Sequence, residues 1–337
     1  MNLSKIGEMG VYKNIVSQFS TEPSSHIIKG IGDDCAIVMR DNDSNMFDII
    51  STDMLVEHTH FLKDRISAYQ LGYKALAANL SDIAAMGGRP KYVALSLGLP
   101  RDTSSEWLND FLSGFKYLAG QYNVVLIGGD TIRSTVIVIN MTMMGVVAKT
   151  DAKLISAAKV DDVVCVTGYV GDSGGGLRLI LDENHLVHSD VTRYLVNAHY
   201  RPHVYLEEGE WLSRQAGVNG MTDVSDGVGG EVKWMSELAG VGFSVELTKL
   251  PISAQLKKIS KIFTWDPLHL ALNGGEDYCL FVTIDKKKFE YIRKQYEEKF
   301  KSPLWEIGRV TQKTSGIEYT YNNEVVPVFA DGYDNFL

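Results

Sequence analysis

Hydrophobic residues recur along this chain with the two spacings that are typical of helices and strands. The clearest helical spacing lies between residues 68 and 86, where Leu76, Leu80 and Ile83 form one apolar stripe. The pair Gly87-Gly88 follows this stripe and predicts the end of the helix. In the first half the pattern predicts helices at 6–19, 68–86 and 104–122, and strands at 36–40, 46–51, 92–99, 136–147 and 124–127, the last one stopping at Gly128-Gly129-Asp130.

The pattern begins again after a polar passage from Lys149 to Lys159. We take this passage as the junction between two α/β domains, which we place at residues 1–149 and 150–337. In the second half the pattern predicts strands at 163–167, 243–247, 278–284 and 307–310, helices at 173–181, 203–215, 228–239 and 286–299, and a turn at 221–226.

Composition narrows the class of protein. The 337 residues carry a formal net charge of −9, with 22% charged and 45% hydrophobic residues. Such a balance is typical of a soluble globular protein and argues against a nucleic-acid binder. The three cysteines lie far apart in or beside apolar runs, which favours buried thiols in a reducing compartment. Because no apolar run has membrane-spanning length and no signal-peptide pattern opens the sequence, we expect a cytoplasmic protein without nucleic-acid or membrane partners.

Acidic residues recur where a strand or helix gives way to a turn. The turn Gly30-Ile31-Gly32-Asp33-Asp34 places two carboxylates side by side, and these repel each other unless a cation or a donor lies between them. Taken alone, Asp82 is more simply explained as a helix-edge acid in contact with water. As a set, the acids match the oxygen ligands that Mg²⁺ uses together with substrate phosphates. The set that predicts one shared site for hard cations and phosphates is Asp34, Asp53, Asp82, Asp130, Asp223 and Asp226.

Other nucleotide-binding or nucleophilic chemistry has little support. The sequence has no GxxxxGK[ST] loop, and no GxGxxG follows a strand with an acid at the required distance. The glycine-rich stretch 168–176 opens a helix and offers amides to an anion, but close helix–sheet packing explains its glycines equally well. No activated nucleophile or general base is visible. That absence fits phosphoryl transfer to an acceptor phosphate, whose oxygen is already largely ionised near neutral pH.

Seven segments form a specific set, namely GIGDDCA, ISTDMLVEHTHF, KALAANLSDIAAMGGRP, LIGGDTIRS, DVSDGVGGEV, NGGEDYCLF and the final GYDNF. In this order they resemble the thiamine-monophosphate kinase family, which belongs to the superfamily of aminoimidazole ribonucleotide synthetase. The resemblance implies two α/β domains, the first of which pairs with its copy in a homodimer and closes a β-barrel across the interface. It also implies ATP-dependent conversion of thiamine monophosphate to thiamine diphosphate by in-line transfer, assisted by several Mg²⁺ ions.

The resemblance implies roles for individual residues as well. The metal ligands fall on Asp34, Ser51, Thr52, Asp53, Asp82, Asp130, Asp223 and Asp226. The nucleotide contacts fall on Gly129, Asp130 and Ser225, and the contacts to the thiamine portion fall on His60, Glu276 and Tyr333.

Two positions depart from the family pattern. His58 stands where we expect a small residue, and we expect it to change the shape of the acceptor pocket. The second departure concerns the nucleotide. Where the family carries an arginine that meets the ATP phosphates, this sequence has Ile155. Lys153 or Lys159 can supply a positive charge there, but as a point charge rather than a bidentate fork. We expect this departure to affect ATP affinity more than the reaction, and we expect arginine at position 155 to tighten ATP binding.

Two other hypotheses stay open. The first is a sister ATP-dependent enzyme with another substrate. Three sister enzymes fit the sequence less well. A selenophosphate synthetase would need a reactive Cys and Lys before Cys35, and the hydrogenase-maturation relative would end in cysteine, whereas this sequence ends in Asn335-Phe336-Leu337. Aminoimidazole ribonucleotide synthetase lacks the combination of STDMLVEHTHF with GGEDY that is present here. The second is a non-catalytic protein that binds a nucleotide or a thiamine phosphate, and Ile155 is its only support in the sequence.

Overall fold

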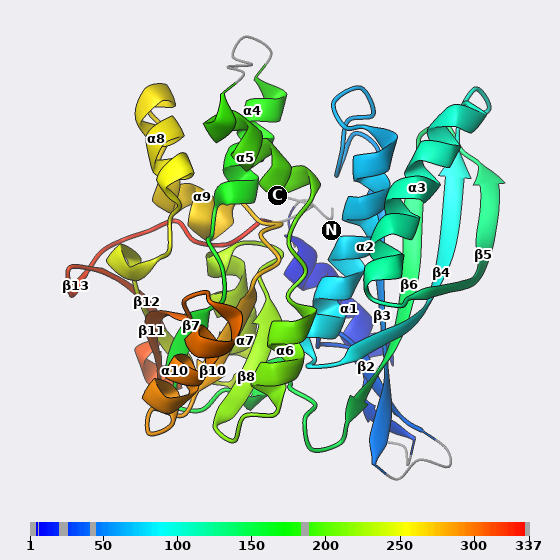
Figure 1. Cartoon of the computed structure of the whole chain (residues 1–337). Coiled ribbons are helices and arrows are strands. Elements are labelled where there is room, and N and C mark those ends of the chain that lie inside the picture. The colour runs from blue at the N-terminus through cyan, green and yellow to red at the C-terminus, as the bar shows by residue number, and fades with distance from the viewer. Residues whose placement is uncertain (1–4, 6, 20–25, 41–44, 183–188, 334–337) are drawn as a thin grey trace.

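The computed structural model describes residues 5, 7–19, 26–40, 45–182 and 189–333, and it contains two β-sheets with helices packed against them (Figure 1). One sheet has six strands and the other has seven. The last residues of the GYDNF segment, 334–336, lie outside the described ranges. Within those ranges no helix is long and apolar enough to cross a membrane.

The first sheet has the strand order β1-β2-β3-β6-β4-β5, and only the pair β4–β5 is parallel. Its strands are β1 (Ile27–Lys29), β2 (Ala36–Met39), β3 (Met46–Val56), β4 (Arg89–Leu99), β5 (Val125–Arg133) and β6 (Val138–Ala148). The predicted hairpin at 36–51 is present as β2 and β3. This arrangement leaves β5 at one edge of the sheet, three strands away from β3.

Two helices cover one face of this sheet (Figure 1). The helix α2 begins after Ser67, whose side chain forms a capping box with Gln70. It packs closely on α3, since a Cβ atom on Gly72 would lie only 2.0 Å from the carbonyl oxygen of Phe111. The helices of the first half are α1 (Gly7–Phe19), α2 (Ala68–Ala85) and α3 (Ser105–Gln121).

The opposite face of the first sheet and its β5 edge are exposed in the single chain. Every residue of β5 is exposed to solvent, although the strand is largely apolar. The exposed large apolar side chains of these strands are Ile28, Ile50, Met54, Tyr92, Val125, Leu126, Ile127 and Ile132. The sheet is therefore open within one chain, and a barrel would need a second copy.

The second sheet has the order β13-β12-β9-β11-β7-β10-β8. Its strands are β7 (Val163–Val166), β8 (Val218–Asp223), β9 (Gly242–Glu246), β10 (Leu280–Ile284), β11 (Trp305–Thr311), β12 (Ile317–Tyr321) and β13 (Glu324–Val325). The interior strand β7 is buried on both faces: Val163 and Cys165 belong to one apolar core and Val164 and Val166 to another.

Helices cover both faces of the second sheet. They are α4 (Asp172–Leu181), α5 (Asp190–Tyr200), α6 (Leu206–Ser213), α7 (Val228–Ala239), α8 (Ala254–Phe263), α9 (Pro267–Asn273) and α10 (Phe289–Phe300), with short 3₁₀ turns η2 (Ile155–Ala157), η3 (Leu247–Lys249) and η4 (Lys313–Ser315). The core that contains Val163 continues into the first half through α2 and α6. The two halves therefore share apolar packing.

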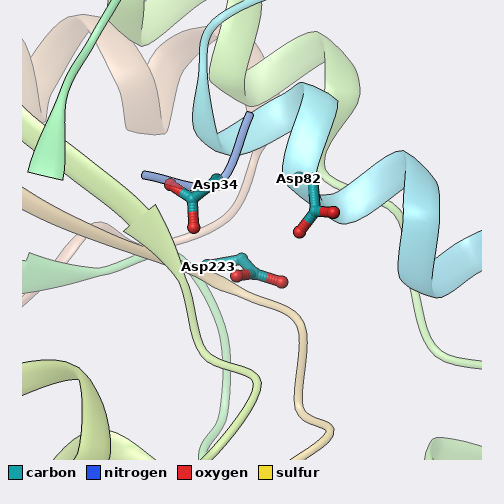
Figure 2. A group of neighbouring side chains, drawn as sticks. All are labelled: Asp34, Asp82 and Asp223. Carbon is teal, nitrogen blue, oxygen red and sulfur yellow. The ribbon is translucent and has the colours of Figure 1, made fainter. Parts of the chain in front are cut away.

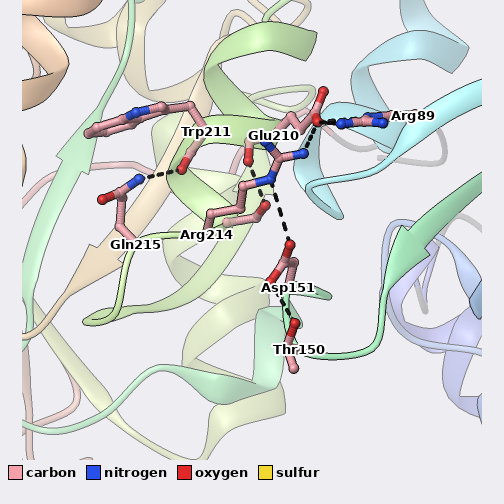
Figure 3. Close-up of polar contacts among 8 residues, drawn as sticks. Arg89, Thr150, Asp151, Glu210, Trp211, Arg214 and Gln215 are labelled. Carbon is pink, nitrogen blue, oxygen red and sulfur yellow. Dashed lines mark hydrogen bonds and ion pairs between the residues drawn. The ribbon is translucent and has the colours of Figure 1, made fainter. Parts of the chain in front are cut away.

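Polar contacts also join the halves (Figure 3). Glu210 on α6 accepts a hydrogen bond of 2.6 Å from Nε of Arg89 on β4, and it also binds Arg214. Arg214 in turn lies 3.7 Å from the carboxylate of Asp151 in the polar passage between the sheets. The predicted boundary between residues 149 and 150 stays a prediction.

Two predicted breaks are wrong. The strand β5 continues through Gly128-Gly129-Asp130 to Arg133, because its parallel pairing with β4 resumes after a register shift. The predicted turn at 221–226 begins instead as strand, since β10 pairs with β8 up to Asp223. The sequence pattern also does not predict α5, α8 or α9.

Candidate active site

Three aspartates from distant parts of the chain meet beside α2 (Figure 2). Asp34 lies in the loop between β1 and β2, Asp82 in the last turn of α2, and Asp223 at the end of β8. One carboxylate oxygen from each residue lies within 4.8 Å of the other two. The fold therefore brings three of the six predicted acids to one point, where both halves of the chain contribute.

Neighbouring hydroxyl groups orient two of these carboxylates. Thr222 Oγ1 donates a hydrogen bond of 2.8 Å to Asp34 Oδ1, and Ser81 Oγ donates to Asp223 Oδ2. In the described part of the chain, Asp34 Oδ2 and Ser51 Oγ are buried and have no hydrogen-bond partner. Buried oxygen atoms normally have a partner, so this arrangement leaves ligand atoms available.

Burial raises the pKa of each acid in this cluster. For Asp34 and Asp82 the pKa lies well above its usual value, first because of burial and then because of neighbouring carboxylates. Burial raises the pKa of Asp53 to about 6 and that of Asp223 to about 6. The ionised cluster is therefore unfavourable unless a positive charge is added.

These residues fit a magnesium site. Their side chains offer only oxygen atoms as ligands. Mg²⁺ prefers oxygen ligands, whereas softer metals prefer nitrogen or sulfur ligands. The three carboxylates supply negative charge at one point, because one oxygen of each lies within 4.8 Å of the others. Asp34, Asp82 and Asp223 are accordingly the residues that would hold the ion, with Asp53 beside them.

A pocket of about 590 Å³ opens next to the cluster. Residues from both halves line it, so the site lies between the two sheets. The predicted site residues among them are Asp53, His60, Asp82, Asp223, Ser225, Asp226, Glu276 and Tyr333. Another part of the wall is apolar and includes Leu62, Ile66, Leu177, Ile180 and Leu181.

Glu231 shapes the turn after β8, and the sequence analysis missed its role. Its Oε1 accepts hydrogen bonds from the backbone amides of Ser225 at 3.2 Å and Asp226 at 3.1 Å. The carboxylate is buried on α7. One feature of the sequence does indicate this role: Glu231 ends the DVSDGVGGE segment and lies one turn into a predicted helix.

The other side of the pocket contains His60 and Glu276. His60 Nδ1 accepts a hydrogen bond of 3.0 Å from the amide of Val56, so in the neutral ring Nε2 carries the proton. Burial lowers the pKa of His60. The backbone of Glu276 has a φ of 57° and its amide donates to Ser225 O at 2.7 Å, which ties this turn to the turn after β8.

Lys74 and His199 also line the pocket, and the sequence analysis missed both. Lys74 was detectable because Lys74, Ala78 and Asp82 follow one another at four-residue intervals on α2 and therefore share a face. His199 had no such signal because the pattern did not predict α5.

Three predicted residues lie elsewhere. Thr52 alternates with Ser51 and Asp53 along β3, so its side chain faces the opposite side of the sheet, where Oγ1 donates to Met141 O at 3.0 Å. Gly129 and Asp130 lie on the exposed edge strand β5. Three strand spacings separate β5 from β3, or roughly 14 Å.

Ile155 is buried in the core of the second half. Its amide donates to Asp33 Oδ1 at 3.2 Å, so the first acid of the GIGDD turn holds this segment. An arginine at this position would replace a buried apolar side chain. The expected gain in ATP affinity from that substitution therefore has no support in the geometry.

The glycine-rich stretch 168–176 already binds a carboxyl group of the chain itself. Asp277 accepts hydrogen bonds from the amides of Gly171 at 2.6 Å and Ser173 at 3.0 Å, at the start of α4. Burial nevertheless raises the pKa of Asp277 to about 8. These amides are therefore not available to a phosphate.

Families and individual proteins of similar sequence match both halves of this chain. Residues 32–147 match the family of AIR synthase related proteins, N-terminal domain, and residues 159–319 match the C-terminal domain of the same proteins. The thiamine-monophosphate kinase of Buchnera aphidicola subsp. Acyrthosiphon pisum is 38% identical over 309 residues, which cover 92% of this chain and 93% of the relative. The thiamine-monophosphate kinase of Bacillus subtilis is 36% identical over 86% of this chain and 87% of its own length.

A solved structure is similar over nearly the whole chain. The structure of AaThiL complexed with AMPPCP and TMP has a TM-score of 0.85 to this chain and 28% sequence identity. The match covers 99% of this chain and 98% of that chain. With the sequence matches above, this chain belongs to the thiamine-monophosphate kinase family of AIR synthase related proteins.

Proposed function

We propose that this protein transfers the γ-phosphoryl group of ATP to thiamine monophosphate and releases thiamine diphosphate. The observation that carries the proposal is the three-aspartate cluster beside a pocket lined by both halves. The family relatives are named for this reaction, and AaThiL binds an ATP analogue, AMPPCP, together with TMP.

Magnesium is the cofactor we infer. When bound, Mg²⁺ would supply positive charge that offsets the negative charge of the phosphates and the carboxylates. Asp34, Asp82 and Asp223 together would hold the ion, and Asp53 lies beside them. The number of ions and the roles of Ser51, Thr52 and Asp226 stay predictions from the family resemblance.

The pocket suggests how the acceptor is oriented. Its phosphate belongs near the acids, where cations can screen the repulsion between negative groups. Its rings belong near His60, Glu276 and Tyr333, which line the same pocket. We assign Ser225, in the turn that Glu231 holds, to the nucleotide.

We infer direct in-line transfer without a general base. The attacking oxygen belongs to a phosphate monoester, whose second pKa is about 6, so it is largely ionised near neutral pH. The protein then needs only to align the two phosphates and stabilise charge. Its buried carboxylates and the tied turns at 223–227 and 274–278 supply a fixed frame for that alignment.

We also propose a homodimer that closes a β-barrel from two copies of the first sheet. The uncovered apolar face and the unpaired edge β5 support it, because such surfaces are normally covered. Gly129 and Asp130 lie on that edge. We therefore expect them to serve the site of the partner copy. A cytoplasmic location stays a prediction.

A product assay tests the function. The protein is incubated with ATP, Mg²⁺ and thiamine monophosphate, and the products are separated by chromatography, with free thiamine as the control acceptor. Thiamine diphosphate formed from the monophosphate alone supports the proposal. ATP-dependent thermal stabilisation without product would favour the non-catalytic binding hypothesis, and turnover of another phosphorylated acceptor would favour a sister enzyme.

A further inference from the structure

A buried lysine lies on the pocket face of α2. The side chain of Lys74 is only 1% exposed. Its Nζ lies 2.9 Å from Glu276 Oε2 and 3.0 Å from His199 Nε2. Three elements, α2, α5 and the turn before β10, therefore meet at this ammonium group.

The chemistry of these groups determines which atoms donate. An ammonium group can only donate, so His199 Nε2 must accept from Lys74 and Nδ1 carries the proton. That Nδ1 lies 3.0 Å from Ser173 Oγ and 3.3 Å from Glu276 Oε2. Burial, with the nearby charge of Lys74, lowers the pKa of His199 to about 3, so the ring is neutral. The group contains one cation, Lys74, and one anion, Glu276.

Only one oxygen of Glu276 is used by this network. In the described part of the chain, the ion pairs and side-chain hydrogen bonds of Glu276 all involve Oε2. The side chain is 24% exposed and lines the pocket. Its backbone is fixed by the left-handed φ of 57° and by the hydrogen bond to Ser225 O. Among the described residues, Oε1 thus has none of these contacts, while the carboxylate is held through Oε2 and through the backbone of the turn.

We infer that Lys74 and His199 are positioning residues, which hold Glu276 so that its second oxygen accepts a hydrogen bond from the amino-bearing, cationic portion of the acceptor. The inference rests on the proposed function, because it takes thiamine monophosphate as the acceptor. A fixed carboxylate discriminates in favour of N–H donors and positive charge, both of which the thiamine portion carries. Lys74 then determines acceptor specificity without touching the acceptor.

Stability alone does not explain the pair. A buried ion pair is often no more stable than apolar side chains of the same size, so the presence of this pair at the buried side of α2 needs another reason. Direct contact of Lys74 with the acceptor phosphate is the main alternative. The geometry disfavours it, since Glu276 and His199 already take two donors of the ammonium group.

Binding measurements with two ligands separate these roles. Dissociation constants for thiamine and for thiamine monophosphate are measured by calorimetry on the wild type and on Lys74→Met. If Lys74 acts through Glu276, both constants rise by the same factor, about 10- to 100-fold, as expected for a lost charged hydrogen bond. A rise for the monophosphate alone would show that the lysine binds phosphate, and unchanged constants would remove it from the site. Either result overturns the inference.

A double-mutant cycle gives the second test. Adding Lys74→Met to Glu276→Gln is expected to weaken thiamine binding little beyond Glu276→Gln alone, because the lysine has lost its target. Fully additive effects would contradict the inference. If Lys74→Met does not fold, His199→Leu replaces it and predicts the same equal weakening of both ligands.

The matched control is Lys249→Met, which breaks another Lys–Glu pair of 2.7 Å, with Glu306, away from the pocket. It is expected to leave both constants unchanged. The kinase assay distinguishes the two proposals. If the wild type forms no thiamine diphosphate, the proposed function and the inference are both wrong. If the wild type is active and the dissociation constants of Lys74→Met are unchanged, only the inference is wrong.

Discussion

Asp34 illustrates the conflict between stability and function at the scale of single residues. Its carboxylate is buried beside Asp82 and Asp223, and Oδ2 has no hydrogen-bond partner in the described residues. Uncompensated buried charge destabilises a folded protein. A bound cation is therefore expected to stabilise the folded state by offsetting the charge of these carboxylates.

The substitution Asp34→Asn tests this conflict. The amide keeps the shape and removes one negative charge, so without metal the variant is expected to melt a few degrees higher than the wild type, while its kcat/KM falls about 100-fold or more. Differential scanning calorimetry in EDTA and the product assay measure the two effects. The control is Asp172→Asn, because Asp172 accepts from Ser253 at 2.6 Å and Tyr194 at 2.9 Å and should lose stability instead. A lower melting temperature for Asp34→Asn would contradict the account.

The raised pKa values predict how metal-free stability depends on pH. Folding raises the pKa of Asp53 and of Asp223 from about 4 to about 6, so the folded state binds protons more tightly. The free energy of unfolding therefore falls as pH rises from about 4 to about 6. Asp34 and Asp82, with pKa values raised further, extend the fall to higher pH.

Urea unfolding in EDTA across this range measures that fall, and saturating Mg²⁺ is expected to remove most of it. The variant Asp82→Asn should show a shallower fall than the wild type. A free energy of unfolding that rises with pH in EDTA would show that the acids are stabilised by partners in the protein.

The sequence predicts site residues unevenly at this scale. Asp34, Asp82 and Asp223 were found because acids at turns form a repeated pattern that needs no knowledge of contacts. Lys74 and His199 were missed because their roles depend on a contact across 125 residues. The side chain of Thr52 faces away from Ser51 and Asp53, a result of strand alternation that motif matching ignores.

At the scale of elements, the turn after β8 depends on α7. Glu231 receives the amides of Ser225 and Asp226, so the start of the helix holds the turn that carries the predicted nucleotide contact. The turn before β10 is fixed to it by the amide of Glu276. Both turns therefore move together if they move at all.

Glu231→Leu is expected to leave two amides unpaired, which lowers the free energy of unfolding by about 1–3 kcal/mol and raises the KM for ATP. Glu231→Gln keeps an acceptor oxygen and serves as the matched control, with smaller effects on both. Chemical denaturation and steady-state kinetics measure the changes. An unchanged KM for ATP in Glu231→Leu would show that the turn does not need this contact.

Elements with strong local signals are predicted and others are not. The helix α2 combines an apolar stripe with a capping box and a glycine stop, and the predicted range 68–86 differs from the observed end by one residue. The strand β5 extends past Gly128-Gly129 because β4 supplies a pairing partner, which local pattern cannot reveal. The missed helix α8 did carry a signal, an N-cap at Ser253 followed by Leu256 and Ile259 on one face.

At the scale of the whole molecule, the two halves meet around the site. The acid cluster takes Asp34 and Asp82 from the first half and Asp223 from the second. Shared apolar packing and the contacts of Glu210 fix the halves relative to each other. The acids at turns predicted one shared site with residues from both halves, and the hydrophobic pattern predicted the two α/β halves themselves.

A complementation experiment tests the proposed dimer and the place of Asp130 within it. Chains with Asp53→Ala and chains with Asp130→Ala are co-expressed with different tags, and mixed dimers are purified. If Asp130 serves the partner's site, each mixed dimer contains one intact site and has about half the wild-type turnover. Mixed dimers of Asp53→Ala and Asp223→Ala are the control and should be inactive, since both residues belong to one chain's cluster. Inactive dimers of the first kind would place Asp130 in its own chain's site, and an active Asp130→Ala homodimer would show that the residue is not needed.

The most direct test of the central claim is thiamine diphosphate formation as a function of Mg²⁺ concentration, in the wild type and in Asp82→Asn. The account predicts that the wild type is inactive without Mg²⁺ and becomes active as the ion binds. It predicts that Asp82→Asn loses at least about 100-fold in kcat/KM and needs more Mg²⁺ to reach its maximum. Wild-type activity in Asp82→Asn at the same Mg²⁺ concentration would contradict the claim that the three aspartates form the magnesium site of a kinase.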